Sequence, residues 1–178
     1  MIIIINIILI ALSLSVDSFV FALSYAPNVK NYSKCLLLAV FVGIFHFFMP
    51  LIGSFFGIKL FEYTYISPRI IMFIVFLLLS IDMIMNYFDN NKRIIKLNLV
   101  GMIIFSFSVS LDSFSVGIGL KYMYNSVLVC TSIFCIVSFF ITSFGFFIGK
   151  SISQKVGKYA FVLSSVVLFF YSIWVLTK

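Results

Sequence analysis

The stretch SLSVDSF, residues 13–19, places an aspartate in the middle of a long apolar segment. A near copy, SVSLDSF, occupies residues 108–114 and shares five of its seven positions with the first. Both copies follow the pattern S-x-S-x-D-S-F, and both lie within apolar runs. We interpret them as an internal repeat, with repeat one covering about residues 1–90 and repeat two about residues 91–178.

The composition of the whole chain is typical of a membrane protein. Of its 178 residues, 63% are hydrophobic and 10% are charged, whereas a soluble domain is about 45–50% apolar and about 25% charged. The net charge of +7 is compatible with nucleic-acid binding, but the Lys and Arg residues lie between apolar runs, as they do at membrane surfaces. We therefore expect a lipid bilayer around this chain and no nucleic acid.

Six segments are long and apolar enough to cross the hydrocarbon core, which takes about 20 residues of helix. They cover about Ile2–Ala26, Cys35–Ile58, Ser67–Phe88, Ile94–Leu120, Val127–Gly149 and Val156–Leu176. The prediction is an all-α integral membrane protein, a single membrane domain over residues 1–178. Because each repeat holds three spans, an odd number, the second copy crosses in the opposite sense. Two inverted three-helix repeats are typical of secondary transporters, whose sites lie near the bilayer midplane.

The basic residues predict the orientation in the cell membrane. The first, third and fifth connections carry eight Lys and Arg residues, and the opposite side carries four. Cytoplasmic connections hold an excess of these residues, so those three connections are predicted to be cytoplasmic and both termini to lie outside.

Asp17 and Asp112 are costly where they lie, because a charge at the bilayer centre costs about 2.5–3.5 kcal/mol on insertion scales. All twelve Lys and Arg residues lie in connections or at span ends, so no basic side chain within a span can neutralise them. Asp17 precedes Ala26 by nine residues and Asp112 precedes Lys121 by nine. The two carboxylates therefore reach similar depth from antiparallel helices. A bound cation, or a proton, is the remaining way to neutralise them; the alternative to a functional site is a protonated aspartate that only hydrogen-bonds between helices.

Serines surround both aspartates. In a continuous helix the residue four positions earlier shares a face with the aspartate, and another serine follows it directly. The four serines are Ser13, Ser108, Ser18 and Ser113. Hydroxyl and carboxylate oxygens suit Mg, Ca or Mn. Small residues also let helices approach closely, so each serine has two interpretations.

Two further polar residues lie within spans. His46 lies in FHFFMPLIGSFFG, residues 45–57, and is either a metal ligand or proton carrier, or a helix-packing histidine. Asp82 lies in the third span, where it lines an access path or extends to the interface.

The chain resembles the MntP-type manganese efflux pumps, within the broader lysine-exporter-like superfamily. The resemblance rests on the two D-S-F copies, on residues 45–57 and on six spans in two halves. It implies export of Mn²⁺ as the transported substrate, without a prosthetic group, and makes Asp17 and Asp112 essential. Two positions depart from the family pattern: Ser18 stands where members often have Ala, and Asn86 where many have Glu. D-S-F in both copies is more similar to a branch of sporulation membrane proteins, which is the alternative function.

Other functions fit less well. An intramembrane aspartyl protease would carry G-x-G-D, but Asp112 follows Val109, Ser110 and Leu111, so we do not expect an enzyme. Export of an organic cation or amino acid is a further alternative, but a site for a zwitterion would need cationic or helix-terminal contacts to the substrate carboxylate, and the lack of Lys or Arg within the spans weighs against it. The sequence leaves open whether the chain forms a homo-oligomer.

Overall fold

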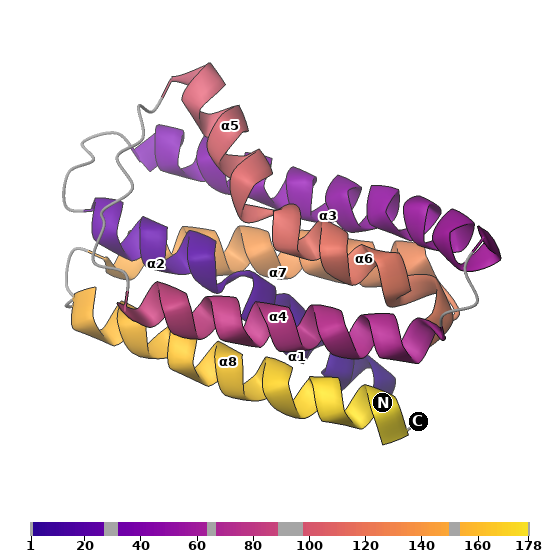
Figure 1. Cartoon of the computed structure of the whole chain (residues 1–178). Helices are drawn as coiled ribbons and strands as arrows, with labels where there is room; N and C mark the ends of the chain where they lie inside the picture. The colour runs from indigo at the N-terminus through magenta and orange to yellow at the C-terminus, as the bar shows by residue number, and fades with distance from the viewer. Residues whose placement is uncertain (1, 27–31, 64–66, 89–97, 150–153, 178) are drawn as a thin grey trace.

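A computed structural model describes residues 2–26, 32–63, 67–88, 98–149 and 154–177, and all regular structure in these ranges is helical. The helices are α1 (Ile2–Leu14), α2 (Val16–Tyr25), α3 (Tyr32–Tyr63), α4 (Pro68–Phe88), α5 (Leu99–Val109), α6 (Leu111–Met123), α7 (Val127–Ile148) and α8 (Gln154–Thr177). Figure 1 shows most of them lying alongside one another, with the start of α1 and the end of α8 at the same end of the bundle. The expected all-helical fold is confirmed.

The sequence predicted six helices, and the described residues form eight. The difference arises because the first and fourth predicted spans are each broken into two helices. The breaks fall at Ser15 and Ser110, and the flanking helices bend by 44° and 45°. At each break the serine hydroxyl donates to a carbonyl of the preceding turn, Ala11 at 2.7 Å and Phe107 at 3.0 Å. Such bonds compete with the backbone ladder and bend helices. Apolar residues flank both serines, so the apolar pattern alone did not indicate the breaks.

Membrane-spanning character is clear for part of the described chain. Helices α3, α4 and α7 are long and apolar enough to cross a bilayer, and the bent pairs α1–α2 and α5–α6 qualify if each pair is one span. The sixth predicted span contributes a shorter apolar helix, Phe161–Thr177. Six crossings in two inverted repeats stay a prediction. The segments 27–31, 89–97 and 150–153, which hold five of the eight basic residues on the predicted cytoplasmic side, lie outside the described residues.

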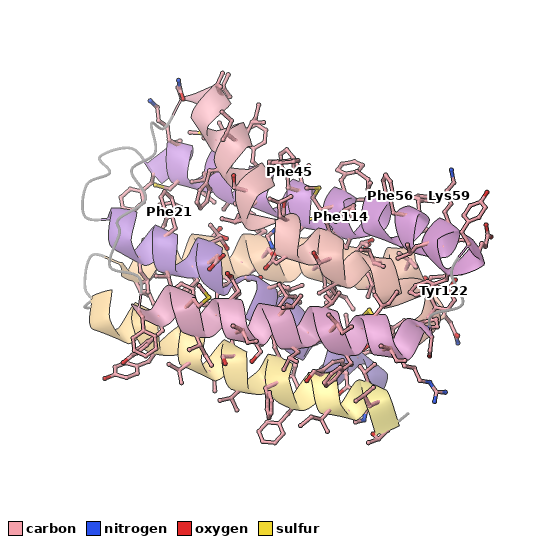
Figure 2. The ribbon with its side chains drawn as sticks, viewed as in Figure 1. Phe21, Phe45, Phe56, Lys59, Phe114 and Tyr122 are labelled. Carbon is pink, nitrogen blue, oxygen red and sulfur yellow. The ribbon has the colours of Figure 1, made fainter. Side chains whose placement is uncertain are left out.

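Glycines let α3 approach α6, and α7 approach α2, at closely related points. A Cβ on Gly53 of α3 would overlap the carbonyl oxygen of Phe114, and a Cβ on Gly145 of α7 would lie 2.9 Å from the carbonyl oxygen of Phe19. Phe19 and Phe114 are the last residues of the two motif copies. Figure 2 shows Phe114 beside Phe56 of α3, with ring centroids 5.9 Å apart. The first motif copy therefore packs against α7, and the second packs against α3.

Candidate metal-binding cavity

The helix breaks place both aspartates at helix N-termini. Asp17 is the second residue of α2, and Asp112 is the second residue of α6. The first turn of a helix presents backbone N–H groups without intrahelical partners, which favour negative charge. The Ser113 amide makes this contact, donating to Oδ1 of Asp112 at 2.6 Å. The same break thus produces the same helix position for the aspartate in both motif copies.

One open cavity of about 290 Å³ brings the two aspartates together. Residues of α2, α4, α5 and α6 line it: Asp17, Leu79, Asp82, Ser108, Val109, Leu111, Asp112 and Ser115. None of these lining residues is basic, so three carboxylates face the space without a lining cation. In a medium of low dielectric constant such an arrangement strongly favours a cation or protons.

The two oxygens of Asp112 have different surroundings. Oδ1 accepts from the Ser113 amide and, at 3.4 Å, from the Ser113 hydroxyl. Oδ2 is buried and has no hydrogen-bond partner among the described residues. The negative charges of Asp17 and, more weakly, of Asp82 act on this carboxyl group. Since buried polar atoms are nearly always paired, Oδ2 is the atom of this cavity most in need of a ligand.

The lining serines complete an oxygen-rich set. The Ser108 hydroxyl donates to the Ile104 carbonyl at 2.9 Å, and the Ser115 hydroxyl donates to the Leu111 carbonyl at 3.4 Å. Each hydroxyl thus uses its proton within its own chain segment and keeps oxygen lone pairs for a cation. Oxygen ligands of this kind suit Mg²⁺, Ca²⁺ or Mn²⁺.

The cavity is not a ready-made metal cage. In the part of the chain that the structure describes, no group of three His, Cys, Asp or Glu side chains is close enough to hold one ion. An ion here would therefore take one or two carboxylates and complete its coordination with hydroxyls and water, as hard cations commonly do.

The remaining serines of the predicted site do not line the cavity. Ser18 is buried between helices, where its hydroxyl donates to the Ser15 carbonyl and accepts from Thr142 of α7, both at 2.9 Å. Ser13 is also buried, and its carbonyl accepts from the Ser164 hydroxyl of α8 at 3.4 Å. Ser113 contacts Asp112 as described above. Of the four serines, only Ser108 lines the cavity, and for Ser18 and Ser13 the structure shows contacts between helices.

His46 is fully buried in α3 and does not line the cavity either. Its Nδ1 lies 2.9 Å from the Val42 carbonyl, one turn earlier in the same helix. Nε2 of His46 makes no hydrogen bond within the described ranges. The backbone of Leu14, at the end of α1, is near enough to interact electrostatically with the ring. His46 therefore packs next to the first helix break.

Sequence reasoning missed the residues that hold the first break in place. The Ser15 hydroxyl lies 2.8 Å from that of Ser138 in α7, and Thr142 of α7 bonds to Ser18. The signal was the repeated second serine of the motif, together with hydroxyl residues spaced four apart in the fifth span.

Asp82 lines the cavity, which favours the first of its two interpretations, a residue that lines an access path. The side chain of Asn86 lies outside the described residues.

The chain is similar to a family described as "Putative manganese efflux pump", whose model matches residues 29–176. Relatives with the same description come from Bacillus pumilus, Methanobrevibacter smithii and Oceanobacillus iheyensis. The first is 30% identical over 92% of this chain and 89% of the relative. The second and third are 30% and 31% identical, each over 97% of this chain and 96% of the relative. No solved structure matches the chain significantly.

Proposed function

This chain belongs to the MntP family of manganese efflux pumps, and we propose that it exports Mn²⁺ from the cytoplasm across the cell membrane. One observation carries the proposal beyond family membership: Asp17 and Asp112, one from each motif copy, line the same cavity, and none of the residues lining that cavity is basic. Two carboxylates balance the charge of one divalent cation. The protein acts as a transporter and not as an enzyme.

The same carboxylates offer a way to release the ion. An aspartate binds either a metal ion or a proton, so exchange of one Mn²⁺ for two protons keeps the pair neutral in both states. Asp112 supplies Oδ2 for the ion while the Ser113 amide holds Oδ1. Ser108 and Ser115 add hydroxyl oxygens at the cavity wall.

Alternating access would come from two inverted repeats, with both termini outside. The related breaks and the related glycine contacts of Phe19 and Phe114 support the repeats. In Figure 1, α5 leans away from the bundle while α1 lies within it, and α1 packs against α8. The cavity is open and is lined by α5 and α4 together with α2 and α6, whereas no residue of α1 lines it. In the opposite state, α5 would close on α4 and α1 would leave α8.

Manganese tolerance in a host that lacks its own exporter tests the function. The wild-type chain should lower cell-associated Mn and restore growth at high Mn²⁺, whereas Asp17→Ala and Asp112→Ala should each fail, at comparable membrane levels. Glu62→Gln is the matched control, because Glu62 is an exposed acid at the end of α3 outside the cavity. Rescue by either Asp variant as complete as that of wild type would contradict the mechanism.

The alternative, a sporulation-associated membrane protein with another substrate or none, follows from D-S-F in both copies. It predicts no manganese phenotype for the wild-type chain and tolerance of Asp→Asn at both motif positions. The same growth experiment with Asp17→Asn and Asp112→Asn therefore separates the two functions.

A further inference from the structure

Asp82 is a third carboxylate of the cavity, and the export scheme above does not use it. It lies on α4, three residues after Leu79, and both side chains line the cavity with Asp17 and Asp112. The Asp82 residue is exposed, whereas Oδ2 of Asp112 is buried. The cavity therefore has one exposed acidic residue and one buried carboxylate oxygen, and we take the side of Asp82 as its mouth and the side of Oδ2 of Asp112 as its inner end.

Asp17 and Asp82 are each near enough to Asp112 to act on its carboxyl group, but the three carboxylates do not share an ion. Asp17 and Asp82 both act electrostatically on Asp112, and Asp17 has the larger effect. No three acidic, His or Cys side chains in the described ranges are close enough to bind the same metal ion. An ion held by Asp17 and Asp112 therefore leaves Asp82 outside its coordination shell.

A separate observation indicates that the inner end takes a ligand. Oδ1 of Asp112 is satisfied by Ser113, but Oδ2 has no hydrogen-bond donor among the described residues. A buried acceptor without a donor is rare in native proteins, and a cation satisfies it. A cation that moves from Asp82 to Asp112 would therefore pass from an exposed acidic residue to a buried carboxylate oxygen that has no hydrogen-bond donor among the described residues.

We propose that Asp82 captures the divalent cation at the cavity mouth and passes it to Asp17 and Asp112. This role rests on the proposed export function and adds a loading step to it. A cleft lined by one sign of charge raises the association rate of an oppositely charged ligand by about 10–10³-fold. Because Asp82 lies outside the shell of the held ion, its charge acts on loading and not on the turnover of the loaded transporter.

Transport kinetics of the full chain in proteoliposomes test this role. Mn²⁺ flux is followed by quenching of a trapped metal-sensitive dye, over a range of Mn²⁺ concentrations. Asp82→Asn should raise the half-saturating Mn²⁺ concentration about tenfold and leave the maximal rate within roughly twofold of wild type. Asp82→Glu keeps the charge and should restore the half-saturating concentration. Glu62→Gln, which removes an exposed acid outside the cavity, should change neither quantity.

An unchanged half-saturating concentration in Asp82→Asn overturns the loading role. So does a lost maximal rate with unchanged half-saturation, because that result assigns Asp82 to the bound ion or to folding. If Asp82→Asn does not fold, the wild type and Asp82→Glu are measured over a range of ionic strengths instead. Their half-saturating Mn²⁺ concentration should rise with ionic strength, because salt screens exposed charges. A half-saturating concentration that does not change with ionic strength overturns the role. Wild-type liposomes without any Mn²⁺ flux overturn the export function itself and the loading role with it.

Discussion

The two bent helix pairs, α1–α2 and α5–α6, carry the same motif in different surroundings. Both break at the second serine of the motif, Ser15 or Ser110, and they bend by nearly the same angle. Ser13, before the first break, is buried, and its carbonyl accepts from Ser164 of α8. Its counterpart Ser108, before the second break, is exposed and lines the cavity.

The break serines Ser15 and Ser110 are both buried, but their hydroxyl groups have different partners. The Ser15 hydroxyl reaches Ser138 of the neighbouring α7, while the Ser110 hydroxyl donates to Phe107 in its own chain segment. Helix α1 packs against α7 and α8, and α5 packs mainly against α3 (Figure 1). The motif therefore sets the local break, and the neighbouring helices decide whether the first serine of a copy faces the cavity, as Ser108 does, or is buried between helices, as Ser13 is.

Cysteine labelling should show the difference between the surroundings of Ser13 and Ser108 most clearly. In a background where Cys35, Cys130 and Cys135 are replaced, Ser108→Cys should react with a water-soluble thiol reagent at least about tenfold faster than Ser13→Cys, because accessible thiols react faster. The measurement is the labelling rate in detergent micelles, and Mn²⁺ should slow labelling of Ser108→Cys. Equal rates at the two positions would show that the copies have the same surroundings.

Alanine at the two motif-facing glycines should show the tighter packing of the second motif. Gly53→Ala places a methyl group into the Phe114 carbonyl, a backbone atom that moves only with α6, and should cost about 2–3 kcal/mol. Gly145→Ala meets the equivalent carbonyl of Phe19 at 2.9 Å and should cost about 1 kcal/mol. Unfolding of both variants in detergent gives the two losses. A larger loss at Gly145 would reverse the assigned order.

The smallest effect concerns the break serines. Ser15→Ala removes a hydrogen bond between helices and should lower the free energy of unfolding by about 0.6–1.7 kcal/mol. Ser110→Ala removes a bond within its own segment and should cost less than Ser15→Ala. A double-mutant cycle of Ser15→Ala with Ser138→Ala should show coupling, and its absence would remove this difference between the copies.

The candidate site was predictable in its charges but not in its lining. Asp17 and Asp112 stand out because a carboxylate is expensive in an apolar run. Ser13 was expected beside Asp17 because the two are four residues apart in a continuous helix. The break at Ser15 removes that relation, since the two residues belong to different helices. Asp82 comes from a helix distant in sequence, and no local pattern relates it to the motif.

The sequence by itself determined the apolar helices, the repeated motif and the family, because composition, spacing and identity are properties of the chain alone. Both breaks fall at the second serine of the motif, so their position also follows from the sequence. The apolar pattern from which the spans were predicted did not indicate them. Only the tertiary structure decided that α5 and not α1 borders the cavity, and that Asp82 faces the two motif aspartates. These features depend on which helices pack together. Two copies of the same motif pattern acquire different surroundings only through the helices that pack against them.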